Sequence, residues 1–339
     1  MPSLHDSIHS STQGERFAVQ TAFENTETLT SRAARFADCA THGKLYLDGY
    51  PAEVKLWIHR CGDRLCPLCS GYRAKRISNQ LLALMSNFKS VRHMVLTVEN
   101  SPQGELSSSI AHMRASFAKL RRTPQWREKV RGGAYILEIT HNPKKNSWHP
   151  HIHILWDGLY FDQRLLSALW CDASDGSMVV WTSAASARHA AYLAKYAGKP
   201  PNINHWKSAA IAEYAIATSR SRMLQTFGNM HGIPVEDSDP RPEPASVRNS
   251  ITLKRLLDAA QAGHAGASQL CRAVSMRWPR LWNYLRQGCD IPPPDIVPKN
   301  EKIIENLDIE LTRCSRFVME LTEPIGEPSR KYRKSEISQ

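Results

Sequence analysis

Three histidines recur at every second position of one apolar segment, and this pattern constrains the fold of the chain more than any other. The segment is Trp148–Trp156, and its histidines are His149, His151 and His153. Side chains alternate between the two faces of a β-strand, so an extended backbone places all three imidazoles on one face. Two imidazoles in such an arrangement can converge on a divalent cation and leave positions open for a phosphate oxygen and water. A single histidine would more often be a core residue, whereas three in register favour a metal site.

The strand expected before this segment carries a candidate oxygen ligand, Glu138. Residues 134–140 are typical of a strand, and residues 142–147 (Asn-Pro-Lys-Lys-Asn-Ser) favour a turn, so the two strands should form a hairpin. Such a hairpin brings Glu138 near His151. The third ligand is then Glu138 or, where Glu138 is an ordinary charged strand residue, His149.

The order of expected elements between residues 55 and 227 is strand, helix, hairpin, helix, strand, helix. This order suits an α+β fold, an antiparallel sheet with helices packed on its face, rather than a doubly wound parallel sheet. The expected strands are 91–98, 134–140, 149–156 and 178–181, and the expected helices are 106–120, 165–170 and 186–197.

Two tyrosines near the end of the expected helix 186–197 form a second candidate site. Tyr192 and Tyr196 share one helix face, and Lys195 and Lys199 lie beside them. A phenol has a pKa near ~10, so its attack on phosphorus needs nearby cations that favour the phenolate. By themselves, tyrosines at this spacing are more often a packed pair. The histidine strand is what favours a nucleophile here.

Four cysteines in the first fifth of the chain have the spacing of a zinc site. They are separated by 21, 4 and 2 residues, and basic residues follow them. Thiolates in such pairs suit tetrahedral zinc, which would fold a basic platform against the DNA backbone. Buried thiols without metal are the alternative, and His42 or His59 can replace Cys39 as a ligand. The expected zinc ligands are Cys39, Cys61, Cys66 and Cys69, and the expected DNA-binding residues are Arg73, Lys75, Arg76 and Lys195.

The charge of the chain indicates a polyanionic partner. Lys and Arg number 44 against 32 Asp and Glu, a net charge of +12, and residues 51–130 alone hold 14 basic and 5 acidic residues. This clustering favours a nucleic-acid partner over the alternative that the excess basic residues only keep the protein surface soluble. The N-terminal residues lack the apolar core of a signal peptide, and no apolar run reaches the ~20 residues that span a bilayer. We therefore expect a cytoplasmic protein with no membrane partner, in which clustered cysteines bind metal.

Taken in order, three motifs resemble those of the HUH endonucleases, and within them the plasmid rolling-circle replication initiators. The resemblance covers roughly residues 35–228. It rests on a Leu-Thr strand (Leu96, Thr97), the histidine strand (His151, His153) and a Tyr-x-x-Lys helix (Tyr196, Lys199). In the first motif Glu99 stands where the family more usually has a second threonine.

The resemblance implies a role for each matching residue. Tyr196 would be the nucleophile that forms a 5′-phosphotyrosine link, His151 and His153 would bind Mg²⁺ or Mn²⁺, and Lys199 would steady the phosphate. Some plasmid initiators carry a glutamate four residues before the nucleophile, where this chain has Tyr192. The pattern Tyr-x-x-x-Tyr-x-x-Lys looks more like initiators of small single-stranded-DNA phages, in which two tyrosines alternate. Tyr192 is therefore a candidate second nucleophile.

Composition divides the chain into six expected segments. Prolines mark linkers near residues 234–244 and 292–294, and three short helical patterns lie between them. This module is either a DNA-reading helix-turn-helix or a plain three-helix subdomain. The segments are a flexible arm (1–35), a zinc-binding basic segment (36–80), an HUH nuclease domain (81–228), a linker (229–250), a small helical module (251–290), and a linker, helix and basic tail (291–339).

The function implied by the resemblance is initiation of rolling-circle plasmid replication by site- and strand-specific DNA nicking. A host helicase and a polymerase are the expected partners, because the sequence contains no ATP-binding Gly-x-x-x-x-Gly-Lys-Ser/Thr loop. One alternative is a single-strand transposase or mobilisation relaxase with the same chemistry. The other is a non-catalytic, zinc-containing DNA-binding regulator, which would leave the histidine strand and the tyrosine helix unexplained.

Overall fold

The chain is described by a computed structural model, in which residues 4–48, 53–185, 202–203, 205–219, 221–232 and 250–277 are described. It divides into two compact units. The larger unit comprises residues 1–37 and 61–240, and the smaller unit comprises residues 38–60 and 241–339. Each unit contains its own antiparallel sheet.

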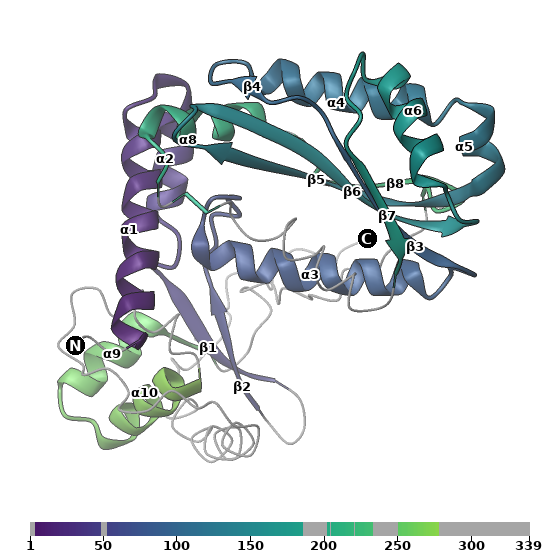
Figure 1. The fold of residues 1–339 in the computed structure, drawn as a ribbon. Helices are drawn as coiled ribbons and strands as arrows, with labels where there is room; N and C mark the ends of the chain where they lie inside the picture. Colours follow the sequence, from purple (N-terminus) through teal and green to yellow (C-terminus); the bar gives the residue numbers. More distant parts are fainter. Residues whose placement is uncertain are drawn as a thin grey trace, which may run out of the picture. The chain divides into compact units, whose positions relative to one another are not determined.

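The sheet of the larger unit has six strands in the order β7-β3-β6-β5-β8, with the short β4 paired to β6 (Figure 1). Every pairing is antiparallel. The expectation of an antiparallel α+β fold is therefore confirmed. The strands are β3 (Val91–Thr97), β4 (Ser101–Pro102), β5 (Val130–Asn142), β6 (Ser147–Gly158), β7 (Val180–Ala184) and β8 (Leu224–Gly228).

The central hairpin of β5 and β6 is held by the turn expected from its sequence. The side-chain oxygen of Asn142 accepts hydrogen bonds from the backbone amides of Lys144 and Lys145, at 3.1 and 3.2 Å. Asn146 then adopts a left-handed φ of 47°, which asparagine tolerates better than most residues. Both strands are longer than expected. The backbone pairing continues to the ends of the hairpin, where the sequence no longer alternates between apolar and polar residues.

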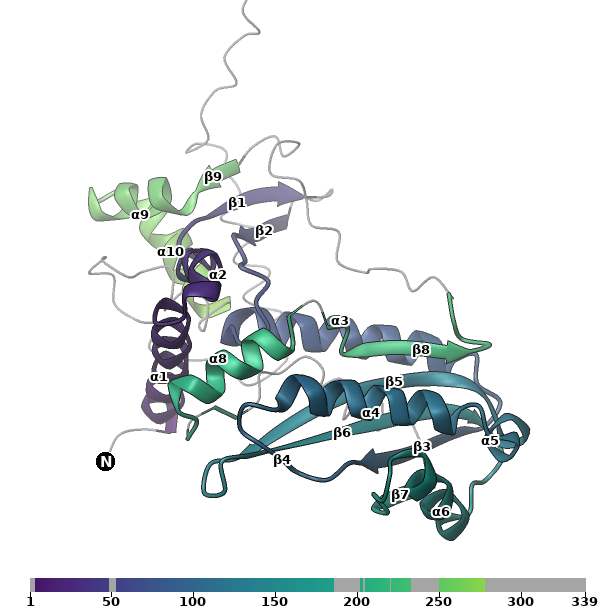
Figure 2. The same cartoon turned by 90° about the horizontal axis from the view of Figure 1, so that it is seen from above.

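Helices cover both faces of this sheet, whereas the sequence suggested one (Figures 1 and 2). On one face α4 (Leu106–Leu120) places Phe117 edge-to-face against Tyr135 and Phe227, with ring centroids 5.0 and 5.7 Å apart. On the other face α3 (Pro67–Met85) forms a buried cluster with the sheet, made of Ile77, Leu81, Leu84, Ala134, Ile136 and Leu155. The sheet is thus the middle layer of three.

Residues 4–37 are mostly helical, which differs from the flexible arm expected at residues 1–35. They form α1 (Leu4–Glu24), the 3₁₀ turn η1 (Glu27–Leu29) and α2 (Thr30–Ala37). Val19, Ala22 and Phe23 are buried at helical spacing, and Phe23 meets Phe36 edge-to-face at 5.4 Å. The apolar stripe was missed because it occupies only the last turns of α1, after a polar beginning.

The remaining helices of the larger unit are short. The helix expected at residues 165–170 is present as α6 (Gln163–Ala173), whose first turn is capped by Asp162. The others are α5 (Pro124–Lys129) and α8 (Ser208–Ala217). The helix expected at residues 186–197 lies outside the described residues.

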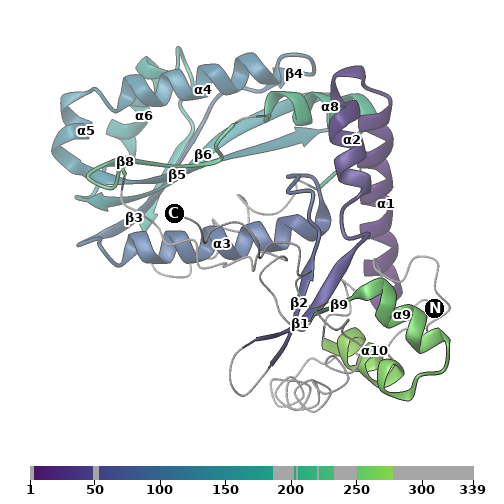
Figure 3. The ribbon, with the colours of Figure 1, turned by 180° about the vertical axis from the view of Figure 1, so that it is seen from behind.

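The smaller unit combines a three-stranded sheet with two helices (Figure 3). Its strands β1 (Gly43–Asp48), β2 (Glu53–Ile58) and β9 (Ser250–Thr252) have the order β2-β1-β9. The helices α9 (Leu253–Gln261) and α10 (Ala265–Arg277) match two of the three helical patterns expected for a C-terminal module, and the third lies outside the described residues. Strand β9 pairs with β1, which lies some 200 residues earlier in the chain, and the sequence did not predict this pairing. The expected 36–80 segment is divided between the two units, at residues 60 and 61.

Within the part of the chain that the structure describes, no helix is long and apolar enough to cross a membrane.

Candidate metal centre

The β5–β6 ladder brings together the acidic residue and two of the histidines singled out from the sequence. Glu138 is the direct cross-strand partner of His151, and Ile136 is that of His153. Glu138 Oε2 lies 2.8 Å from Nε2 of His151 and 2.8 Å from Nε2 of His153. The three side chains are only 15, 13 and 8 % exposed. The sheet backbone therefore holds one carboxylate and two imidazoles around a single point.

The second nitrogen of each imidazole has its own partner, and this orients the rings. His151 Nδ1 lies 3.3 Å from the backbone oxygen of His149, and His153 Nδ1 lies 3.3 Å from Nε2 of His93. In the structure both Nε2 atoms face Glu138. If a cation displaced the protons on Nε2, these same atoms would be free to bind it while each Nδ1 kept its outer contact. Outer hydrogen bonds of this kind are how metal-binding histidines are usually positioned.

Glu138 is held in its ionised form. Burial by itself would raise the pKa of its carboxyl group, but hydrogen bonds from His151 and His153 and their charges outweigh burial and lower that pKa to about 2. An anionic carboxylate beside two imidazole nitrogens is a ligand set that suits a divalent cation.

The spacing of the three groups fits such an ion. Two ligands at about 2.1 Å from an octahedral ion and at right angles to each other are about 3.0 Å apart. The two contacts of Glu138 Oε2, at 2.8 Å each, are close to this value, and all three ligand atoms lie within 4.8 Å of one another. Three protein ligands leave positions on the ion for phosphate and water.

His149, the other candidate for the third ligand, is turned elsewhere. Its Nδ1 lies 2.7 Å from Oδ1 of Asn100, and its ring centroid is 5.2 Å from that of His151. Burial lowers the pKa of His149, and the neighbouring His151 lowers it further. Of the two alternatives left open by the sequence, the structure places Glu138 beside His151 and His153.

One histidine of this cluster, His93, was not singled out from the sequence. It lies on β3, and its ring stacks on that of His153 with centroids 5.5 Å apart and an interplanar angle of 4°. His93 is 3 % exposed. His93 shares a strand face with Val95 and Thr97, and these two residues pair with His153 and His151. The alternation of side chains along residues 93–97 was therefore the sequence signal that could have placed His93 on the same face as the site.

An exposed tryptophan borders the same face of the sheet. Trp181 on β7 pairs with Val95, which pairs in turn with His153, so the three side chains form a row across the strands. The Trp181 ring meets His93 edge-on at 5.2 Å and is 46 % exposed. Large aromatic rings with this exposure are suitable surfaces for stacking a nucleobase.

The Leu-Thr strand motif lies next to this cluster. Leu96 is fully buried, and Thr97 is the cross-strand partner of His151. Thr97 Oγ1 donates to the backbone oxygen of Val179 at 3.1 Å, which fixes the end of β3. The amide of Glu99 donates to Ser177 Oγ at 3.2 Å.

The four cysteines with zinc-like spacing also come together. Cys39, Cys61, Cys66 and Cys69 are all buried, and their sulfur atoms lie within 4.8 Å of one another. Cys61 Sγ and Cys69 Sγ are 3.7 Å apart. Two thiolates at about 2.3 Å from a tetrahedral zinc ion are separated by about 3.8 Å. Cys66 occupies the N-cap position of α3 and Cys69 lies in the first turn, and the N-terminus of a helix favours thiolates.

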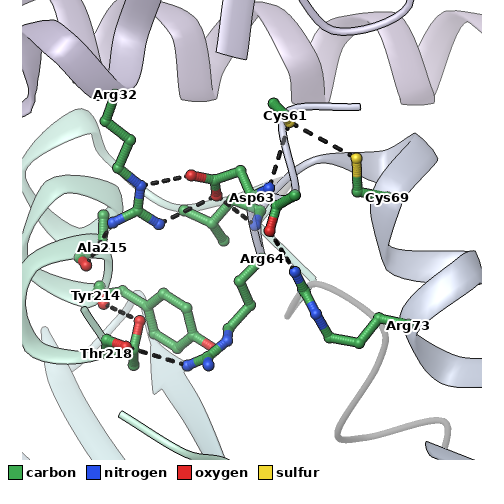
Figure 4. Close-up of polar contacts among 11 residues, drawn as sticks. Arg32, Cys61, Asp63, Arg64, Cys69, Arg73, Tyr214, Ala215 and Thr218 are labelled. Carbon is green, nitrogen blue, oxygen red and sulfur yellow. Dashed lines mark hydrogen bonds and ion pairs between the residues drawn. The ribbon is translucent and has the colours of Figure 1, made fainter. Parts of the chain in front are cut away.

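The loop between these cysteines is fixed by a buried ion pair (Figure 4). Arg32 makes a two-pronged contact with the carboxylate of Asp63, which is 5 % exposed, and also donates to the backbone oxygen of Ala215 at 2.7 Å. Asp63 in turn accepts from the amide of Leu65 at 2.9 Å, and its own amide donates to Cys61 Sγ at 3.3 Å. These contacts preorganise the loop around the cysteine sulfurs.

Arg64, which lies in the loop itself, is packed inside the larger unit (Figure 4). Arg64 donates to the backbone oxygens of Thr218 and Ser221, at 3.4 and 2.9 Å. It also lies beside Tyr214, whose pKa is raised by burial despite the nearby charges of Arg64 and Arg73. Tyr214 is thus a neutral packing residue and a poor nucleophile.

The residues expected to bind DNA differ in their surroundings. Arg73 donates to the backbone oxygen of Gly62 and so supports the cysteine loop, while Arg76 is half-buried and Lys75 is exposed. Lys195 lies outside the described residues, as do Tyr192, Tyr196 and Lys199.

Comparison with known proteins gives one family match. A family described as Replication protein matches residues 54–172. That range contains Glu138, His151, His153 and three of the four clustered cysteines. No solved structure gives a significant match.

Curated relatives support the same family. The chain is 32% identical to the "Protein rep" of Bacillus amyloliquefaciens over 130 residues, which cover 37% of this chain and 38% of the relative. It is 27% identical to that of Staphylococcus aureus over 193 residues, which cover 50% of this chain and 84% of the relative. A third, from Streptococcus pneumoniae, is 31% identical over 28% of this chain and 32% of the relative. The chain thus spans well under half the length of the Bacillus amyloliquefaciens and Streptococcus pneumoniae relatives. The expected resemblance to Rep proteins is confirmed.

Proposed function

We propose that this chain initiates rolling-circle replication of a plasmid by nicking one DNA strand and remaining joined to the 5′ end. The reaction is a metal-dependent transesterification by a tyrosine. One structural observation carries the proposal: a buried carboxylate and two imidazoles converge on one point within the segment that matches replication proteins. A DNA-binding regulator without catalytic activity would have no use for this arrangement.

Glu138, His151 and His153 would hold the catalytic ion, Mg²⁺ or Mn²⁺. When bound, this ion polarises the scissile phosphate. The residues of the chain contribute preorganisation: the β5–β6 ladder fixes the three ligands, and His93 orients His153. Both strands belong to the central sheet, so the ligand geometry does not depend on a loop.

Tyr196 is the proposed nucleophile, on the basis of its motif. Its phenolic oxygen forms a bond to phosphorus, and the bond between phosphorus and the 3′ oxygen breaks. The phenol loses its proton, and the 3′ oxygen takes one up to become the hydroxyl that primes synthesis. Lys199 and Lys195 would favour the phenolate, and Tyr192 would attack in the same way to end a round.

The cysteine cluster would hold a structural zinc ion. The 3.7 Å between Cys61 Sγ and Cys69 Sγ suits a tetrahedral thiolate site. Helix α3 begins at this cluster and packs on the face of the sheet that carries Glu138. Zinc would thus support the position of α3 and of its exposed Lys75. DNA is the proposed partner, with a host helicase and a polymerase supplied in trans.

The test is a nicking assay on supercoiled plasmid that carries the gene for this chain and its flanking DNA. Wild-type protein and Tyr196→Phe are incubated with Mn²⁺ or with EDTA and analysed by denaturing electrophoresis. We expect a nick that needs Mn²⁺, with protein attached to the 5′ end, in the wild type alone. Tight binding without a nick would reject the proposal in favour of a regulator. A nick at a transposon end or transfer origin in place of a replication origin would favour a transposase or relaxase.

A further inference from the structure

A second group of metal-ligand side chains lies in the smaller unit, at the open end of the β1–β2 hairpin. His42 precedes β1 and His59 follows β2, and the last pair of the ladder is Gly43 with Ile58. The amide of His59 donates to the backbone oxygen of His42 at 3.0 Å, which continues the ladder by one pair. The two imidazoles are therefore direct cross-strand neighbours, and their rings stack with centroids 4.6 Å apart.

A strained turn brings a carboxylate to the same place. Ala40 has a left-handed φ of 63°, a conformation that is unfavourable for a residue with a Cβ atom. The turn is held by a hydrogen bond from the Ala40 amide to the His59 backbone oxygen at 3.0 Å and by one from Thr41 Oγ1 to Asp38 Oδ1 at 2.7 Å. As a result Asp38 faces both histidines.

The distances in this group are those of a metal site. Asp38 Oδ2 lies 3.2 Å from His59 Nε2, and Asp38 Oδ1 lies 3.8 Å from His42 Nδ1. Oxygen and nitrogen ligands at about 2.0–2.1 Å from a tetrahedral zinc ion are separated by about 3.3 Å. The three ligand atoms all lie within 4.8 Å of one another.

We propose that Asp38, His42 and His59 form a second zinc site, distinct from the cysteine cluster and from the centre at Glu138. Two imidazoles and one carboxylate are ligands that Zn²⁺ favours, and three protein ligands leave the fourth position to water. The side chains of Asp38, His42 and His59 are 50, 56 and 31 % exposed, so the ion exchanges with solution. Zinc here cross-links the turn at Ala40 to the hairpin and stabilises the smaller unit by mass action.

The experiment counts zinc in the full-length protein after equilibration with Zn²⁺ and rapid removal of unbound metal. It compares the wild type with Asp38→Asn and His59→Ala, and His231→Ala, an exposed histidine outside any ligand group, is the control. We expect each of the first two variants to hold one zinc ion fewer per chain. The control should keep the wild-type number. Asp38→Asn keeps the size of the side chain and its amide oxygen can still accept from Thr41, so the turn survives in that variant.

Titration with Co²⁺ identifies which site is lost. Cobalt bound to thiolates gives an intense near-ultraviolet charge-transfer band, which a site of two imidazoles and a carboxylate does not give. We expect both variants to keep this band and the cobalt equivalent at Glu138, His151 and His153, and to bind the third equivalent at least tenfold more weakly. Two results would overturn the proposal: an unchanged zinc count in the variants, or loss of the thiolate band with His59→Ala, which would make His59 a ligand of the cysteine site.

Discussion

Glu138 stands directly opposite His151 in the β5–β6 ladder, and its Oε2 atom lies 2.8 Å from the Nε2 atom of that histidine. The pairing unites a carboxylate and an imidazole on two strands whose register cannot shift by one residue without moving every apolar side chain to the wrong face. The consequences of removing the charge can therefore be predicted without a change of fold.

Replacing Glu138 by glutamine should abolish metal-dependent nicking and preserve the structure. The amide has almost the same shape but no charge, so we expect Mn²⁺ affinity to fall at least tenfold and the nicking rate at least about 100-fold. Isothermal titration with Mn²⁺ and the plasmid assay measure the two effects. Glu128→Gln, on the exposed side of α5, is the matched control and should behave as wild type. Full activity in Glu138→Gln would mean that the ion binds elsewhere.

A second prediction concerns the cysteine cluster. Purified protein should contain a zinc ion that Cys66→Ser loses, because a structural site with one thiolate replaced binds zinc far more weakly. The variant should also unfold at a lower temperature, since zinc binding contributes to the stability of the loop and of α3. Metal analysis and thermal unfolding monitored by circular dichroism test this. Cys171→Ser, a cysteine of α6 outside the cluster, should keep its zinc; loss of zinc there too would point to nonspecific thiol binding.

The β5–β6 hairpin was predicted well from the sequence because the signals that specify it are close together in the chain. The turn at residues 143–146, which follows Asn142, sets the register, and that register places Glu138 beside His151. The alternation of apolar and polar residues then assigns the face. The motif resemblance pointed independently to His151 and His153, but not to Glu138.

The parts that the sequence missed depend on contacts between distant segments. His93 is 60 residues from His153, and only the pairing of β3 with β6 brings the rings together. Arg32 and Asp63 are 31 residues apart, and neither carries a spacing signal. Strand β9 joins β1 through three residues, too few to show alternation. Side-chain periodicity records which face a residue occupies, but not which other segment will cover that face.

A third prediction concerns acid stability. Asp157 is buried and accepts from Arg131 at 2.8 Å and from the amides of Lys89 and Ser90 at 2.9 and 2.8 Å. The hydrogen bond from Arg131 lowers the pKa of Asp157 below its ordinary value in spite of burial. Its ionised form therefore stabilises the fold above the unfolded pKa of about 3.9, and this contribution is lost as pH falls through the lower folded value.

Asp157→Asn should accordingly lower the free energy of unfolding by about 2 kcal/mol at pH 7, because hydrogen bonds to a charged group are lost. The difference between wild type and variant should shrink as the pH is reduced below about 4. Urea unfolding at pH 7, 5 and 3 measures it, and Asp162→Asn, which keeps the cap of α6 through its amide oxygen, is the control. An equal deficit at all three pH values would show that packing, and not charge, is what Asp157 provides.

The last prediction concerns Trp181, and it depends on the proposed function. This half-exposed ring lies in the same cross-strand row as His153, so a base next to the scissile phosphate can stack on it. Stacking on an aromatic side chain contributes about 1–3 kcal/mol per base, so Trp181→Ala should weaken binding of an origin oligonucleotide about tenfold or more. Trp181→Phe should retain most of the affinity, because it keeps an aromatic face. Fluorescence anisotropy with a labelled single strand, in EDTA to prevent cleavage, measures binding alone. Equal losses in the alanine and phenylalanine variants would indicate that Trp181 acts by supporting His93, with which it is in edge-on contact, and not by stacking a base.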